Sequence, residues 1–68
     1  MENESRKDIR RILKTFGIKA DEAMVAHLAR NPEIGELKIR IVLEDLTDYG
    51  DKSPNKDLGF TMVDKVQR

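Results

Sequence analysis

The sequence offers almost nothing that could cross-link a small fold. The chain has 68 residues, no cysteine and a single histidine, His27. A chain of this length buries only about 60% of the surface that its unfolded form exposes, and small domains usually add disulfides, metals or oligomerisation. Disulfides are excluded here, as are zinc sites built from thiolates or from several imidazoles. We therefore expect one domain, stabilised by helix packing, by dimerisation or by a partner protein.

The charges cancel in total but not in distribution. The 13 basic and 13 acidic side chains give a net charge of +0, whereas dedicated nucleic-acid binders tend to be basic. Residues 1–30 hold seven basic and five acidic groups, and residues 31–68 hold six and eight. Such a layout suits intramolecular pairing, head-to-tail association or a basic patch for a polyanion.

Hydropathy indicates neither a membrane span nor an export signal. No run of 18 apolar residues occurs, and a spanning helix needs about that many. The amino terminus is polar and has no apolar stretch of the signal-peptide kind. We expect no association with membranes and a cytoplasmic location, which the absence of cysteine fits.

The clearest predicted element is a helix over residues 5–16. Ser5 with Asp8 three residues later resembles a capping box, and Gly17 is typical of a residue that ends a helix. Between them, the apolar residues follow the i, i+3, i+4, i+7 spacing of one helix face: Ile9, Ile12, Leu13 and Phe16.

A second helix is predicted over residues 20–30. Met24, Val25 and Leu28 supply its apolar stripe, and its alanines favour helix formation. The pair Asn31-Pro32 closes it, because the residue before a proline disfavours the helical region.

The segment 37–49 supports two interpretations. Its first residues alternate between apolar and polar, as in a strand. A helical stripe also runs through the segment, and its length favours a helix over a strand. We prefer the helix, which would end at Gly50. The stripe consists of Ile39, Val42, Leu43, Leu46 and Tyr49.

The last part of the chain is dense in turn residues and then alternates. Residues 51–59 read DKSPNKDLG, which is typical of turns. A short strand is suited by the alternation that follows; the alternative is a frayed terminus. Phe60, Met62, Asp64 and Val66 alternate there with Thr61, Val63 and Lys65. The predicted fold is thus a mainly α domain with a three-helix core over residues 1–50 and a turn-rich extension over 51–68. An α+β fold is the alternative.

The helical stripe of the third segment, preceded by the turn NPEIGE, resembles the pattern of winged-helix and helix-turn-helix domains. The resemblance covers roughly residues 6–64, and it implies that the third helix reads DNA while the tail forms the wing. Lys38 and Arg40 would then face the major groove. The sequence departs from that role because acidic residues make the segment net negative and it has no Asn or Gln to read adenine.

A basic stripe is the most distinct candidate surface. Its residues lie opposite the apolar face of the first predicted helix, where they suit phosphate groups or an acidic partner. The alternative is an ordinary solvated helix face. The candidate polyanion-binding or partner-binding residues are Arg6, Lys7, Arg10, Arg11, Lys14, Lys38 and Arg40.

An acidic cluster is the second candidate. In a helical segment 37–49, these carboxylates would crowd the carboxyl end, where the helix dipole disfavours negative charge. They would serve a basic partner or pair within the chain, and the spacing lacks the ligand order of an EF-hand. The cluster consists of Glu44, Asp45, Asp48 and Asp51.

No constellation in the sequence suits catalysis. His27 has no positioned acid–base partner, the serines lack a nucleophile elbow, and the glycines form no phosphate loop. We expect no enzymatic activity, no cofactor, no bound metal and no small-molecule substrate. The predicted function is a non-catalytic interaction module that binds another protein or forms a homodimer. A winged-helix-type nucleic-acid-binding protein is the alternative.

Overall fold

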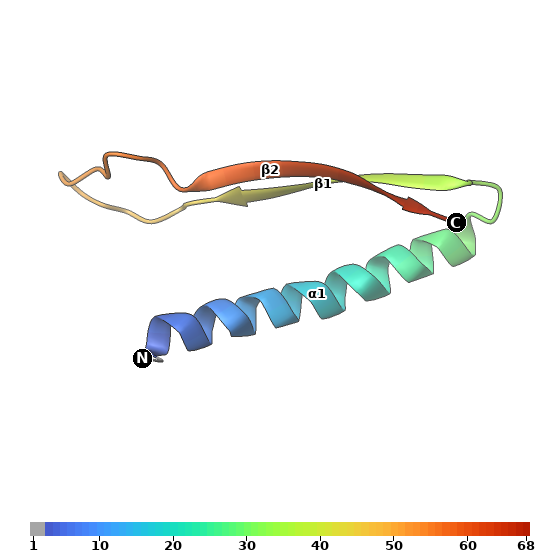
Figure 1. The fold of residues 1–68 in the computed structure, drawn as a ribbon, viewed down its shortest axis with the longest axis horizontal. Coiled ribbons are helices and arrows are strands. Elements are labelled where there is room, and N and C mark those ends of the chain that lie inside the picture. The colour runs from blue at the N-terminus through green and yellow to red at the C-terminus, as the bar shows by residue number, and fades with distance from the viewer. Residues whose placement is uncertain (1–2) are drawn as a thin grey trace. The chain divides into compact units, whose positions relative to one another are not determined.

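The structure, a computed structural model, describes residues 3–68 and contains one long helix and one β-hairpin (Figure 1). The helix α1 spans Glu4–Arg30, and the strands β1 and β2 span Glu36–Glu44 and Gly59–Gln67. The chain divides into a helical unit that ends at Ile34 and a hairpin unit over Gly35–Arg68.

The predicted three-helix, mainly α fold is wrong, and the α+β alternative describes the observed class. The residues predicted as a first and a second helix form one continuous helix, and those predicted as a third helix begin with a strand. Residues 1 and 2 of the predicted 1–50 core lie outside the described residues.

The start of α1 is set by Asn3 rather than by Ser5. Asn3 has an extended backbone, and its side-chain oxygen accepts a hydrogen bond from the Arg6 backbone N–H at 3.0 Å. This bond satisfies one of the amide groups that have no partner in the first turn. Ser5, the predicted first residue of the helix, therefore lies inside the first turn.

The helix passes through Gly17 without a break. Gly17 was expected to take a left-handed conformation, but the positive-φ glycine of the described chain is Gly50, at φ 63°. Good helix formers, the alanines at 20, 23 and 26 among them, follow directly and allow the helix to propagate. The helix ends at Arg30 as predicted, where the Asn31 side chain donates to the His27 carbonyl at 2.8 Å.

Replacing Gly17 by alanine is expected to stabilise the protein. Glycine inside a helix costs roughly 0.5–1 kcal/mol relative to alanine, and a Cβ at position 17 would have nothing within 4 Å. Thermal unfolding followed by circular dichroism should show a midpoint raised by about 2–8 °C. An unchanged or lowered midpoint would mean that the glycine is needed at this position.

The hairpin is a two-stranded antiparallel sheet with an unbroken register. Glu36 lies opposite Gln67 at one end and Glu44 lies opposite Gly59 at the other. The apolar–polar alternation therefore decided the structure of both segments. The prediction that the last part of the chain forms a short strand is confirmed. The length of segment 37–49 was misleading because its last five residues belong to the connection that follows β1.

The connection between the strands is organised by local hydrogen bonds. The Asp48 carboxylate accepts from the Gly50 backbone N–H at 2.9 Å, and Lys52 donates its backbone N–H to the Tyr49 carbonyl at 3.1 Å. The positive φ of Gly50 suits glycine in this turn, because other residues enter that region at a cost.

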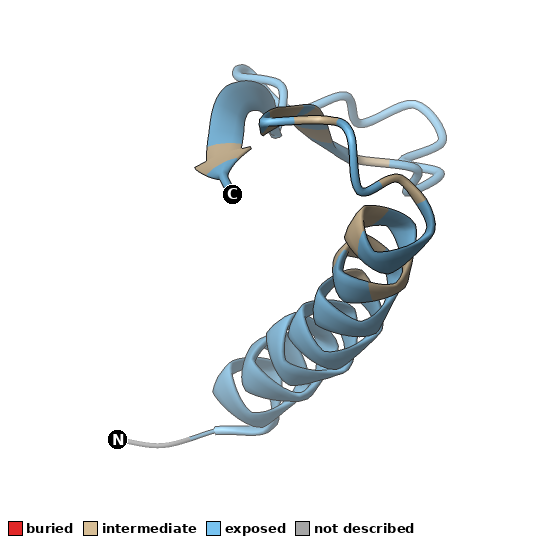
Figure 2. Cartoon of the chain, turned by 90° about the vertical axis from the view of Figure 1, so that its right-hand side faces the viewer, coloured by how far each residue is buried: buried red, intermediate tan, exposed pale blue. Residues whose placement is uncertain are grey.

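Neither unit contains a hydrophobic core. Across residues 3–68 no side chain is buried, and the exposures range from intermediate to full (Figure 2). A single helix and a two-stranded sheet have no interior of their own, so their apolar residues need a further surface to become buried.

Candidate interaction surfaces

The first surface is the apolar face of α1, which we call the helix seam. Its positions are separated alternately by four and three residues, as in a heptad repeat. They consist of Ile9, Leu13, Phe16, Ala20 and Ala23, with the polar His27 at the end. The large side chains are far from buried: Leu13 is 62% exposed and Phe16 is 47% exposed. Ile12 borders the seam. The seam is therefore shaped for contact with another apolar surface.

The second surface is one face of the hairpin, which we call the hairpin face. Residues directly opposite in an antiparallel pair point to the same side of the sheet, so the register defines the face. From β1 it contains Leu37, Ile39, Ile41 and Leu43, and from β2 it contains Phe60, Met62, Asp64 and Val66. Asp64 is the charged exception on an otherwise apolar surface.

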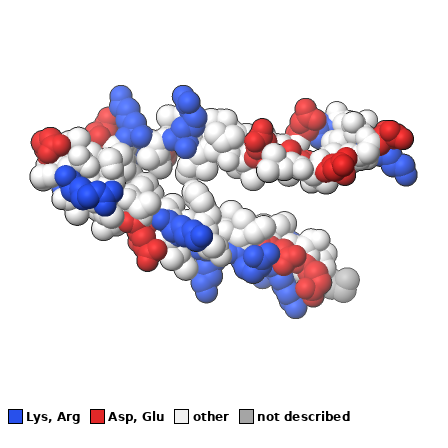
Figure 3. Space-filling model, turned by 180° about the vertical axis from the view of Figure 1, so that it is seen from behind, with Lys and Arg blue, Asp and Glu red and all other residues white. Residues whose placement is uncertain are grey.

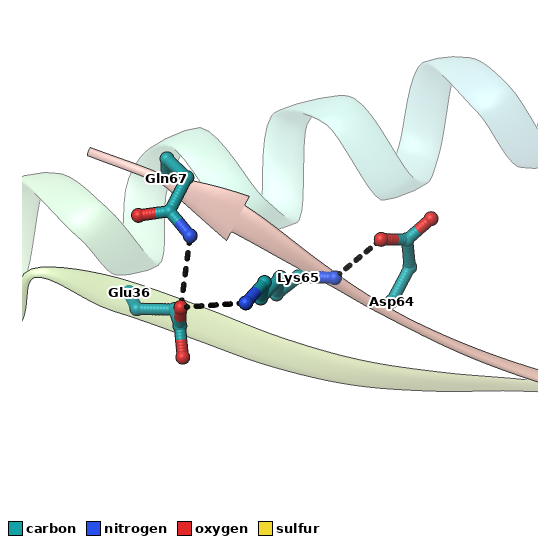
Figure 4. A network of polar contacts seen from close by, with 4 residues as sticks. All are labelled: Glu36, Asp64, Lys65 and Gln67. Carbon is teal, nitrogen blue, oxygen red and sulfur yellow. Dashed lines mark hydrogen bonds and ion pairs between the residues drawn. The ribbon is translucent and has the colours of Figure 1, made fainter.

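The opposite side of the hairpin is mostly polar, apart from two exposed valines, and carries an ion pair. The Lys65 ammonium lies 3.5 Å from the Glu36 carboxylate, and the Gln67 side-chain amide donates to the same carboxylate at 2.8 Å (Figure 4). Lys65 lies directly opposite Lys38, so the diagonal pair with Glu36 offsets a like-charge contact. The hairpin is therefore amphipathic, with one face for water and one for a partner.

Five of the sequence-predicted basic residues lie on α1, and two lie on β1. Arg6, Lys7, Arg10, Arg11 and Lys14 line the amino-terminal half of the helix (Figure 3). Within this set, Lys7 is 3.8 Å from Glu4 and Arg11 is 3.6 Å from Asp8. Pairs this exposed contribute little to stability, so Glu4 and Asp8 hold Lys7 and Arg11 only weakly.

Lys38 and Arg40 lie on the polar side of β1, in the hairpin unit. They were expected near the start of a recognition helix, and that expectation is wrong because the segment is a strand. A recognition helix carries the base contacts of the helix-turn-helix class, and residues 36–44 are not helical.

The acidic cluster does not crowd a helix end. Glu44 is the last residue of β1, and Asp45, Asp48 and Asp51 lie in the connection. The Tyr49 hydroxyl donates to the Asp45 carboxylate, and the Thr47 backbone N–H donates to it at 2.9 Å. Two of the four carboxylates thus accept hydrogen bonds from nearby residues of the connection, a role that the helical interpretation missed.

These bonds shift two pKa values. The hydrogen bond from Tyr49, followed by those from Thr47, lowers the pKa of the Asp45 carboxyl below its ordinary value. The same bond raises the pKa of the Tyr49 hydroxyl, because ionisation would remove the donor. A carboxyl with a lowered folded-state pKa contributes stability above its unfolded-state pKa of about 4, which is lost as the pH falls through the folded-state pKa.

Replacing Tyr49 by phenylalanine is expected to raise the pKa of Asp45 toward the ordinary carboxyl value. The Thr47 bond remains, so the return should be partial. Side-chain carboxyl NMR shifts recorded from pH 2 to pH 7 would measure it. An unchanged Asp45 titration would show that the Tyr49 hydroxyl does not reach the carboxylate in solution.

Over residues 3–68, no three side chains of His, Cys, Asp or Glu are grouped so that they could hold a metal ion. The hollow beside the connection is shallow and lined by Glu44, Asp45, Thr47, Tyr49, Ser53, Pro54 and Asp57. Within the described part of the chain, α1 is too polar to cross a membrane.

Comparison with known proteins gives no relative. No family model, curated protein sequence or solved structure matches the chain. The two apolar surfaces and the charges around them are therefore the features from which a function can be inferred.

Proposed function

We propose that the protein is a non-catalytic interaction module that binds a second copy of itself through its apolar surfaces. The observation that carries this proposal is the absence of any buried side chain among residues 3–68, together with exposed large apolar groups in both units. The cytoplasmic location expected from the sequence remains part of the proposal.

The free energy of burying a few large apolar side chains is comparable to the stability of a whole domain. Burying one large apolar side chain is worth roughly 1.5–3 kcal/mol, and a whole domain is typically stable by only about 5–15 kcal/mol. Ile9, Phe16 and Phe60 are among the residues that are about half exposed or more. Leaving a set of such residues in water would forfeit most of the free energy that a 68-residue chain has available for folding.

The exposed apolar residues are organised into two surfaces and are not scattered, which favours self-association. The helix seam keeps the heptad spacing along most of α1, and the hairpin face keeps its apolar residues on one side of both strands except at Asp64. Exposed apolar patches of this kind are typical of interaction sites.

The proposal predicts that stability depends on protein concentration. A partner that binds only the folded state stabilises that state by mass action. The thermal midpoint should rise steadily between about 5 µM and 500 µM protein. A midpoint that stays constant over this range would contradict self-association.

A second candidate is polyanion binding by the basic residues of α1. One observation favours it: Arg10 and Lys14 lie away from the helix seam, so both surfaces can be used together. Arg10→Glu with Arg11→Glu should abolish amide NMR shifts induced by generic duplex DNA at low salt, where phosphate contacts are strongest. DNA-induced shifts that survive in this variant would exclude the basic residues of α1 as the site.

A further inference from the structure

The hairpin has two open edges. In a sheet with only two strands, each strand pairs on one side and leaves a row of backbone N–H and C=O groups on the other. An isolated two-stranded hairpin is marginally stable in water, and it needs a third strand or a helix packed against it to be stable. The edges are therefore candidates for pairing with another strand.

The edge of β2 is poorly suited to pairing with its own copy. Asp64 lies on the hairpin face of β2, and an inward-pointing charge is a common device against edge pairing. An antiparallel β2–β2 ladder centred on Val63 would set Met62 against Asp64. A ladder centred on Asp64 would oppose the two carboxylates directly.

The edge of β1 is better suited to pairing with its own copy. Arg68 donates its backbone N–H to the Gly35 carbonyl at 3.1 Å, which makes these opposed residues a hydrogen-bonded pair. Hydrogen-bonded pairs alternate along an antiparallel ladder. Counting along β1, the backbone groups of Lys38, Arg40 and Val42 are therefore directed to the open edge.

We propose that β1 pairs with β1 of a second copy, antiparallel and centred on Ile41, which extends the hairpin to a four-stranded sheet. The proposal rests on the self-association proposed above and adds a strand-to-strand contact to the apolar ones. In this register Lys38 of each copy lies opposite Glu44 of the other, so two ion pairs form across the junction. Ile39 lies opposite Leu43, which keeps apolar residues together.

Neighbouring registers are less favourable. Centring on Arg40 would place Arg40 against itself and Glu36 against Glu44. Centring on Ile39 would place Lys38 against Arg40. Like charges directly opposite each other destabilise a strand pair, so the charge pattern of β1 disfavours both.

The remaining close alternative is centred on Val42. It would pair Arg40 with Glu44, but it would set Ile39 against Asp45 and shorten the ladder. The register centred on Ile41 pairs Ile39 with Leu43, sets only the terminal Leu37 against Asp45, and puts the hairpin faces of the two copies on the same side of the sheet. The result is one apolar surface of twice the width, interrupted by Asp64 of each copy.

Charge reversal tests the register. Lys38→Glu would set glutamate against Glu44 twice in each dimer, and Glu44→Lys would set lysine against Lys38 twice. Either single variant should raise the dimer dissociation constant on the order of tenfold, because each opposed pair changes from attractive to repulsive. The double variant restores two opposite-charge pairs and should return the constant to within about threefold of the wild-type value.

The single variants separate association from folding. Lys38 lies opposite Lys65 within its own hairpin and Glu44 lies opposite Gly59, so neither reversal sets like charges directly opposite each other inside the hairpin. Lys56→Glu, in the connection, makes the same charge change away from β1 and should leave the dissociation constant unchanged. Circular dichroism would confirm that each variant is folded.

An isotope-filtered NOE experiment provides an independent readout. In a mixture of labelled and unlabelled chains, Hα of Ile39 should give a cross-peak to Hα of Leu43 in the other copy, because Cα atoms in such non-hydrogen-bonded pairs are only about 4.5 Å apart.

The outcomes separate the two proposals. Weakening by each single reversal with rescue by the double variant, together with the NOE, would support β1 pairing. Reversals without effect on a protein that still dimerises, or single effects without rescue, would overturn the β1 junction and leave self-association standing. A wild-type monomer would overturn both.

Discussion

Ile9→Asp is expected to dissociate the oligomer, whereas the same substitution at Ile18 is not. Ile9 belongs to the helix seam, and a carboxylate there would have to be desolvated at the interface or leave it open. Because a buried unpaired charge typically costs several kcal/mol, the dissociation constant should rise by at least about a hundredfold. Sedimentation velocity at a fixed protein concentration would measure the loss.

Ile18 is a closely matched control for this experiment. The two isoleucines are 53% and 52% exposed, so the substitution removes a similar apolar surface in each case. At 3.6 residues per turn, their separation of nine residues makes two and a half turns, which places Ile18 on the opposite face. Equal effects at both positions would contradict a specific role for the helix seam.

Asp64→Val is expected to tighten the association. Asp64 interrupts the hairpin face opposite Ile39, and any partner that covers this face must desolvate the carboxylate. Removing the charge should lower the dissociation constant by at least about tenfold, which corresponds to roughly 1.4 kcal/mol. Isothermal dilution calorimetry would report the change.

Asp51→Val provides the control for that prediction. Asp51 lies in the connection, so the variant has the same change in charge and hydropathy without touching the hairpin face. If both variants tighten association equally, the effect comes from general hydropathy. If Asp64→Val weakens association, the carboxylate has a partner in the assembly.

Part of this fold could be predicted from the sequence, because local patterns were strong where local physics decided the outcome. Asn31-Pro32 ended α1 at the expected residue, since proline removes a donor and restricts its predecessor. The alternation around Phe60 and Val66 formed β2. In both cases the signal lies in neighbouring residues and needs no knowledge of the partner surface.

The remaining elements depended on competition between signals. Gly17 is a common helix terminator, but its cost of about 1 kcal/mol is small beside the propensity of the residues on both sides. In the segment from Leu37, a helical stripe and a strand alternation were both present. The opposed residues of β1 and β2 are separated by between 15 positions (Glu44 and Gly59) and 31 positions (Glu36 and Gln67) along the chain, so the local pattern alone could not decide between them.

The candidate surfaces, too, could be predicted from the sequence only in part. The basic residues from Arg6 to Lys14 were expected on one helix, and they lie on α1. The seam beyond Phe16 was missed, because dividing the helix at Gly17 separated Ala20 and Ala23 from the earlier residues. Reading the heptad spacing across the glycine would have found it.

Sedimentation equilibrium of the wild-type chain at several concentrations tests self-association most directly. The chain has a mass of 7.8 kDa. We expect the apparent mass to rise with concentration to at least twice that value. The helix and strand signals in circular dichroism should rise in parallel. A folded protein that keeps the monomer mass up to millimolar concentration would contradict self-association.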